Sequence, residues 1–166
     1  HGLAHYTDYL ALLDRDADGA EAQTAVDLLT TNETYFFREG KHFDRLRALA
    51  DEAPRGQPFR VWSAACSSGE EPYSMAMVLA DVRADRPWEI VGSDISTRVL
   101  QRARSGHYPM ERARQVLPAY LKRFCLKGRD EQDGTLLVAR ALRERVKLLQ
   151  VNLNAPMELC RQLMPR

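Results

Sequence analysis

Residues 60–74 read RVWSAACSSGEEPYS, a short apolar run followed by a loop of small residues and then by Glu70, Glu71 and Pro72. The apolar run predicts a buried strand, and Pro72 suits the first turn of a helix. A strand, a loop and a helix in this order form the place where an open α/β sheet presents a ligand pocket. The stretch therefore favours an α/β fold with a binding site after this strand.

The composition of the loop favours a ligand without phosphates. Its serines, its alanines and Gly69 let the backbone approach a bound molecule, and the two acids place negative charge beside a cationic centre or free hydroxyl groups. A phosphate-binding loop would carry a lysine instead. S-adenosylmethionine is the nucleoside-like ligand that fits best, although a small-residue loop after a strand is equally compatible with a plain tight turn.

The sequence on either side of this stretch alternates strand and helix patterns. Strands are predicted at 59–63, 89–93 and 145–151, and helices at 71–82 and from the N-cap residue Ser96 to residue 104. Strand, helix, strand, helix, strand argues for a parallel sheet with right-handed crossovers.

The remaining segments divide the chain into a helical front part and a later insert. Residues 1–52 carry three helical patterns, and the Pro- and Gly-containing stretch 53–58 predicts the boundary to the α/β part at 53–166. Within that part, 115–142 reads as an insert with a short helix at 118–124. Two strands around a polar tip at 128–134 then predict a hairpin.

Composition excludes several classes of function. The chain has 166 residues, a net charge of +1 and 45% apolar residues, so we expect a packed core and neither nucleic-acid binding nor membrane insertion. The cysteines at positions 66, 125 and 160 are odd in number and far apart, which points to a reducing compartment and hence to the cytoplasm. We predict no metal site, because neither the cysteines nor the histidines have ligand spacing.

Three polar residues are candidates for a site at the end of the sheet. Asp94 ends the second strand, where acids bind ribose hydroxyls in nucleotide-binding folds, but it is also a plausible helix N-cap. Asn152 ends the third strand, where an amide could bind an adenine edge, but taken alone it favours a turn after the strand. Arg38 follows Phe36 and Phe37, which read as packing anchors. Its planar guanidinium group suits a bidentate contact with a carboxylate. The alternative is that Arg38 is an ordinary arginine on the face of a helix.

Together these pieces resemble the glutamate O-methyltransferases of chemotaxis receptors (methyl-accepting chemotaxis proteins), the CheR-type family. The resemblance covers nearly the whole chain and rests on these stretches: TNETYFFRE at 31–39, RVWSAACSSGEEPYS at 60–74, GSDIS at 92–96, VLQRARSGHY at 99–108 and VNL at 151–153. The first two are highly specific. The resemblance implies a helical N-terminal domain and a Rossmann-like methyltransferase domain with an inserted small antiparallel β-subdomain.

The resemblance also implies a reaction and a site. It implies methylation of glutamate side chains on the cytoplasmic domain of chemoreceptors, with S-adenosylmethionine as cofactor and S-adenosylhomocysteine as product. The positions that it implies for cofactor contact are Asn32, Thr34, Arg38, Glu71, Asp94, Asn152 and Leu153. Arg38 is also the candidate catalytic residue, because it would orient the carboxylate of the acceptor or that of the cofactor.

The comparison with the family pattern leads us to expect a chain that is truncated at both ends. The arginine-rich helix of the family would precede His1, and further strands and helices would follow Arg166. One alternative function is a cofactor-sensing or receptor-binding module of the same fold without catalysis. A dinucleotide oxidoreductase is a weaker alternative, because the loop lacks the Gly-x-Gly-x-x-Gly pattern.

Overall fold

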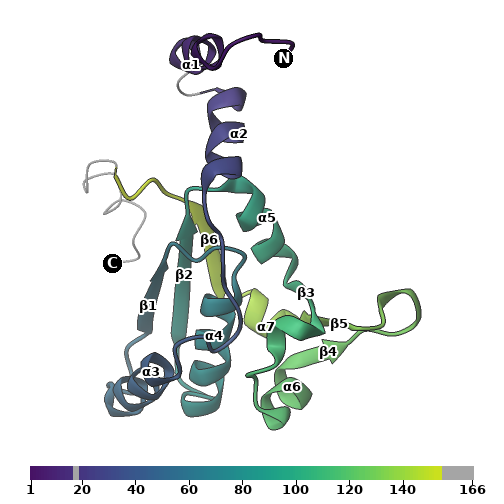
Figure 1. The fold of residues 1–166 in the computed structure, drawn as a ribbon. Helices are drawn as coiled ribbons and strands as arrows, with labels where there is room; N and C mark the ends of the chain where they lie inside the picture. The colour runs from purple at the N-terminus through teal and green to yellow at the C-terminus, as the bar shows by residue number, and fades with distance from the viewer. Residues whose placement is uncertain (17–18, 155–166) are drawn as a thin grey trace.

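The computed structural model describes residues 1–16 and 19–154 and divides them between two small sheets and the helices around them (Figure 1). The helices are α1 (Tyr6–Arg15), α2 (Ala20–Leu29), α3 (Gly40–Glu52), α4 (Glu70–Val82), α5 (Thr97–Ser105), α6 (Pro118–Phe124), α7 (Arg140–Arg143) and the 3₁₀ turns η1 (Met110–Ala113) and η2 (Asp130–Gln132). The strands are β1 (Phe59–Ala64), β2 (Trp88–Asp94), β3 (His107–Pro109), β4 (Cys125–Lys127), β5 (Thr135–Val138) and β6 (Val146–Gln150).

The larger sheet is parallel, with the order β1-β2-β6. Its central strand β2 is buried at nearly every residue, as expected for a strand with neighbours on both edges and helices over its faces. Helix α4 connects β1 to β2, so strand and helix alternate as the sequence predicted. The prediction of a parallel sheet is confirmed, and all three of its strands lie within a residue or two of their predicted positions.

The loop between β1 and α4 turns sharply because three of its residues have left-handed backbone conformations. Ala65, Ser67 and Gly69 have φ values of 54°, 49° and 95°. Only glycine fits the last position, since a Cβ atom on Gly69 would lie 2.7 Å from the Cβ atom of Ala103 and 2.9 Å from the Tyr108 hydroxyl. Gly69 is the N-cap of α4, so this helix begins directly after the close approach to α5.

The smaller sheet is antiparallel, with the order β3-β5-β4. Strands β4 and β5 form the predicted hairpin, and α6 precedes it at the predicted residues. The predicted 115–142 insert contains β4 and β5 but not β3, which pairs His107 with Leu137. A three-residue strand that ends in Pro109 has too little alternation to be recognised in the sequence.

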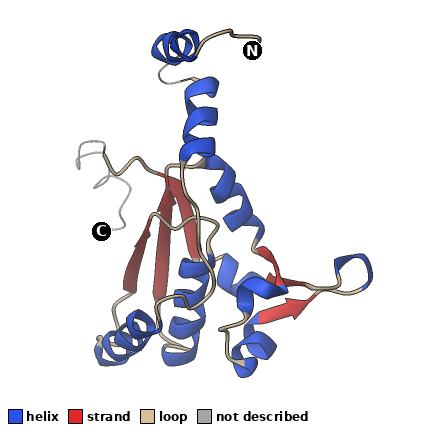
Figure 2. Ribbon diagram, in the orientation of Figure 1, coloured by secondary structure: helices blue, strands red, loops and turns tan. Residues whose placement is uncertain are grey.

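The front part of the chain packs against helices beside the parallel sheet, with α2 on α5 and α3 on α4 (Figure 2). Helix α3 packs on α4 with Phe43 and Ala50 in the core. The buried guanidinium of Arg83 donates hydrogen bonds to carbonyl groups at the end of α3 and in the following loop. Every residue of α1, by contrast, is at least partly exposed.

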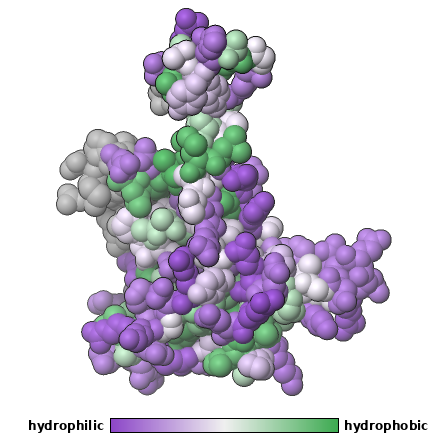
Figure 3. All heavy atoms as spheres, viewed as in Figure 1, coloured by the Kyte–Doolittle hydropathy of each residue, from purple (hydrophilic) through white to green (hydrophobic). Residues whose placement is uncertain are grey.

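The surface near the end of α2 is apolar (Figure 3), and Leu28 and Leu29 are 68% and 83% exposed. Across residues 1–16 and 19–154, no helix is both long and apolar enough to cross a membrane.

Candidate functional site

The carboxyl ends of β1 and β2 border a cavity of about 400 Å³, a volume typical of small-ligand sites. The chain between α2 and α3 descends past these strand ends and forms one wall of the cavity, and the loop after β1 and the end of β2 form the others (Figure 1). The lining residues include five of the predicted cofactor contacts: Asn32, Thr34, Arg38, Glu71 and Asp94. The structure thus collects on one cavity residues that lie far apart in the sequence.

Asp94 is held in place by backbone groups of two different loops. Its Oδ2 atom accepts a hydrogen bond from the Ser67 N–H at 2.8 Å, and its Oδ1 atom accepts one from the Ser96 N–H at 2.9 Å. The N-cap of α5 is Ser96, whose hydroxyl accepts from the Val99 N–H. Asp94 is therefore not the cap. Each of its oxygens keeps a second lone pair that a ligand on the cavity side could use.

The two adjacent acids of the loop have separate environments. Glu71 lines the cavity, and its Oε1 atom accepts a hydrogen bond from the Ser63 hydroxyl at 2.6 Å. Glu70 is only 1% exposed and accepts a hydrogen bond from the Ser68 hydroxyl, away from the cavity lining. Burial raises the pKa of the Glu70 carboxyl. Of the two acids that we expected to face a ligand, only Glu71 is among the described residues that line the cavity.

Phe36 and Phe37 anchor the wall formed by residues 30–39. Phe36 is fully buried, and Phe37 packs against Phe43 with a ring-centroid distance of 4.8 Å. Phe37 also has a left-handed φ of 58°, which reverses the chain direction just before Arg38. Both phenylalanines are thus packing anchors, as the sequence predicted.

Arg38 lines the cavity but is exposed, and it is less tightly held than its aromatic neighbours. One of its guanidinium nitrogens donates to the Glu33 carbonyl at 2.8 Å, and the group lies 5.9 Å from the Tyr35 ring centroid. The guanidinium has five N–H donors, so donors other than the one used by Glu33 could bind a ligand in the cavity that Arg38 lines.

Asn152 and Leu153 are the two predicted contacts that are not among the described residues lining the cavity. They follow Val151, whose N–H donates to the Asp94 carbonyl at 2.9 Å, so they lie at the same edge of the sheet. The Asn152 side chain, however, accepts a hydrogen bond from the Asn154 N–H. This local bond is the turn that the sequence left open as an alternative.

Arg112 does not line the cavity, but it contacts the cavity wall in a way that the sequence did not reveal. It lies in a run of arginines that reads as a solvated face, yet its guanidinium donates to the Thr34 carbonyl and its own carbonyl accepts from the Phe36 N–H. The contact joins residues 78 positions apart, and no spacing pattern signals it. Over the described ranges, His, Cys, Asp and Glu side chains form no cluster of three or more that could hold a metal ion.

Cys66 also lines the cavity, but its chemistry is unsuited to nucleophilic attack. Burial raises the pKa of its thiol to about 12, so the sulfur is protonated at neutral pH. It packs as a small apolar group against Gly92.

The donors and acceptors on the cavity fit S-adenosylmethionine. Two carboxylates, on Glu71 and Asp94, suit hydroxyl groups and a cationic centre, and the Arg38 guanidinium suits a carboxylate. The loop contributes small side chains, which leaves room for a nucleoside against the backbone.

Comparison with known proteins agrees with this fit. Residues 32–163 match the family described as "CheR methyltransferase, SAM binding domain". The chain is 43% identical over 157 residues to the chemotaxis protein methyltransferase of Escherichia coli K12, covering 93% of this chain and 54% of that protein.

Two other bacterial relatives give the same picture. Chemotaxis protein methyltransferase 2 of Pseudomonas aeruginosa is 45% identical over 154 residues, covering 91% of this chain and 54% of that protein. The chemotaxis protein methyltransferase of Borreliella burgdorferi is 37% identical over 163 residues, covering 92% and 56%. The chain spans about half the length of these curated relatives. The extent of the family match, together with these identities, shows that the chain belongs to the CheR methyltransferase family, with residues 32–163 in its S-adenosylmethionine-binding domain.

Proposed function

We propose that the protein uses S-adenosylmethionine to methylate glutamate side chains on the cytoplasmic domain of bacterial chemoreceptors. The observation that carries this proposal is the convergence of Glu71, Asp94 and the 32–38 segment on one cavity at the carboxyl end of a parallel sheet. The printed names of the relatives, chemotaxis protein methyltransferases, support the reaction class and the biological process. Such a protein would act in the cytoplasm.

In this proposal different residues of the cavity bind different parts of the cofactor. Asp94 accepts hydrogen bonds from the ribose hydroxyls, because its position at the end of β2 is the one that acids use for this purpose in nucleotide-binding folds. Glu71 lies beside it, and Asn32, Thr34 and Arg38 contact the cofactor from the opposite wall. Asn152 and Leu153 belong to the proposed site because they follow β6 at the same sheet edge.

The reaction places modest chemical demands on the protein. When bound, S-adenosylmethionine would supply an electrophilic methyl group: the acceptor carboxylate oxygen would bond to the methyl carbon as the bond from that carbon to sulfur breaks, with S-adenosylhomocysteine as the leaving group. The acceptor glutamate needs no general base, since its reference pKa of about 4.3 leaves it ionised at neutral pH. The residues of the site must align the acceptor and exclude water, and such positioning can lower a barrier by roughly 7–11 kcal/mol. Arg38, at the cavity mouth, is the residue we assign to orienting a carboxylate.

The finer description of the fold is also part of the proposal. We assign residues 1–52 to a helical N-terminal domain and linker, and residues 53–166 to a Rossmann-like methyltransferase domain. We assign residues 115–142 to an inserted β-subdomain. The parallel order β1-β2-β6 and the separate antiparallel sheet support this division.

A transfer assay with the full-length protein tests the function. The protein is incubated with S-adenosylmethionine labelled in its methyl group and with the cytoplasmic domain of a chemoreceptor. We expect a base-labile methyl ester on the receptor, and glutamate-to-alanine changes at the labelled positions should abolish the signal. Cofactor binding without transfer to any receptor would favour the non-catalytic module, and absence of binding would contradict both functions.

A further inference from the structure

Glu70 is a buried carboxylate whose place in the molecule the cofactor site does not explain. It begins α4, is 1% exposed and accepts a hydrogen bond from the Ser68 hydroxyl at 2.7 Å. A buried carboxylate costs folding free energy unless hydrogen bonds or an opposite charge compensate it. The opposite charge comes from Arg112, whose Nη1 atom lies 3.9 Å from Glu70 Oε1.

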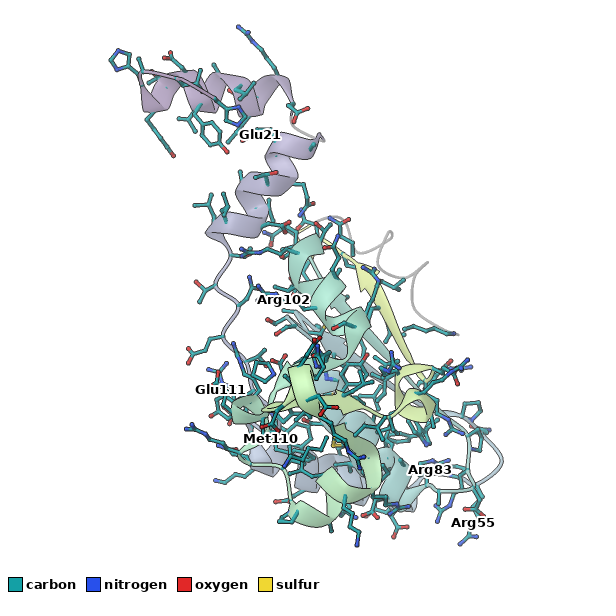
Figure 4. The ribbon with its side chains drawn as sticks, turned by 90° about the vertical axis from the view of Figure 1, so that its right-hand side faces the viewer. Glu21, Arg55, Arg83, Arg102, Met110 and Glu111 are labelled. Atoms are coloured by element: carbon teal, nitrogen blue, oxygen red, sulfur yellow. The ribbon has the colours of Figure 1, made fainter. Side chains whose placement is uncertain are left out.

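Arg112 connects this carboxylate to the wall of the cavity. The same Nη1 atom donates a hydrogen bond to the Thr34 carbonyl, and the Arg112 carbonyl accepts one from the Phe36 N–H at 3.2 Å. In Figure 4 the chain that descends from α2 passes beside η1, where the labelled Met110 and Glu111 lie. A single arginine therefore binds the 34–36 stretch from both its side chain and its backbone.

A second connection ties the same stretch to the start of α4. The Phe37 N–H donates to the Ser74 hydroxyl at 3.0 Å, and that hydroxyl donates to the Glu70 carbonyl at 2.7 Å. Phe37 needs such support, because a left-handed conformation is unfavourable for a bulky aromatic residue. Both connections meet at Glu70, one through its side chain and one through its backbone.

We propose that Glu70 and Arg112 are a positioning pair, which contacts neither cofactor nor acceptor but holds residues 34–37 in the form that presents Thr34 and Arg38 to the cavity. The proposal rests on the proposed function in one respect, namely that the cavity binds S-adenosylmethionine. It gives the two adjacent acids different roles: Glu71 lines the cavity, and Glu70 holds the wall formed by residues 34–37 in place. The pair makes the cavity wall depend on η1, the turn that directly follows strand β3 of the small sheet.

Calorimetric titration of full-length variants with S-adenosylmethionine tests the pair. We expect Arg112→Met to weaken binding about tenfold, the loss that follows when a charge-assisted hydrogen bond no longer orders a binding segment. Arg112→Lys should recover part of the affinity, since it keeps the charge beside Glu70 but lacks a second donor arm. Arg129→Met is the control, because Arg129 is an exposed arginine in the hairpin, away from residues 34–37, and the affinity of this variant should equal that of the wild type.

Glu70→Gln separates positioning from general stability. Burial raises the pKa of Glu70 above its unfolded value, so ionisation of this group lowers stability as the pH rises through the folded pKa. Removing the charge should therefore not lower the unfolding temperature at neutral pH, although it should weaken cofactor binding. The double variant Glu70→Gln/Arg112→Met should bind no more weakly than Arg112→Met, because the two residues act as one unit.

Hydrogen exchange without cofactor gives a readout that does not depend on the proposed function. In Arg112→Met, peptides covering residues 34–37 should exchange faster, while those covering β2 should exchange as in the wild type. Wild-type exchange in 34–37, or faster exchange throughout the sheet, would overturn the positioning role, as would wild-type affinity. A wild-type protein that does not bind S-adenosylmethionine would instead contradict the proposed function, and the exchange result would still decide the role of the pair.

Discussion

Asp94 illustrates how one side chain can order the protein and still remain available to a ligand. Its two oxygens accept backbone N–H groups from the loop after β1 and from the start of α5, so the carboxylate fixes both loops at once. The sequence predicted its place at the end of a strand and its spacing from the loop. It also predicted Ser96 as the N-cap of the following helix, which the structure confirms, although it left the same role open for Asp94 because both residues are good N-caps.

The first residue-scale prediction concerns Asp94→Asn. This variant removes the charge that we assign to the ribose hydroxyls. Its NH2 group also cannot accept one of the two backbone N–H groups, so the unfolding temperature is measured alongside to separate a loss of binding from a loss of stability. Charge-assisted hydrogen bonds contribute roughly 1.5–3 kcal/mol, so the affinity for S-adenosylmethionine should fall by about 10- to 100-fold. Isothermal titration calorimetry measures the change, with Asp133→Asn in the exposed hairpin as a control. Unchanged affinity would remove Asp94 from the site.

The second concerns Arg38→Lys. Arg38 is exposed, so the free energy of unfolding of the lysine variant should lie within about 0.5 kcal/mol of the wild-type value. Its loss of the planar fork should nevertheless greatly reduce methyl transfer. Steady-state kinetics identifies the carboxylate that Arg38 serves: a higher KM for the cofactor alone points to the cofactor, and a lower kcat at saturating cofactor points to the acceptor. Normal values of both would make Arg38 a structural residue.

At the scale of elements, the sequence predicted what local patterns determine. The three parallel strands, the hairpin and the helix α6 all follow from apolar periodicity and turn residues, and the structure has them. Strand β3 was missed because it has three residues and a proline. The contacts of Arg112 were missed for another reason: they join residues far apart in the sequence, and the surrounding arginines resemble an ordinary solvated face. Tertiary contacts of this kind have no local signal.

The loop between β1 and α4 provides a prediction at this scale. Gly69→Ala should destabilise the protein by more than about 1 kcal/mol, because it combines a left-handed conformation with a clash against α5. Gly134→Ala is the matched control: Gly134 also has a positive φ, of 77°, but an added Cβ atom would meet nothing within 4 Å. Urea denaturation should show a larger loss for Gly69→Ala. Equal losses would mean that strain alone, and not the approach of α5, makes glycine necessary there.

At the scale of the whole molecule, the cavity depends on three parts of the chain that fold from different patterns. The parallel sheet supplies Asp94, the first turn of α4 supplies Glu71, and the segment between α2 and α3 closes the cavity with Arg38 and its neighbours. Five of the seven predicted contacts converge there, whereas Asn152 and Leu153 lie outside the lining among the described residues. The position of the site could be predicted from sequence motifs. The wall formed by residues 30–39 could not, because it depends on the contact between Thr34 and Arg112 of η1.

The most direct measurement is a crystal structure of the full-length protein with S-adenosylhomocysteine. The account predicts density for the ligand in the cavity between residues 32–38 and the loop after β1, with the ribose hydroxyls on Asp94 and the Arg112–Thr34 contact intact. Ligand density at another place on the sheet, or a ribose that Asp94 does not touch, would contradict it.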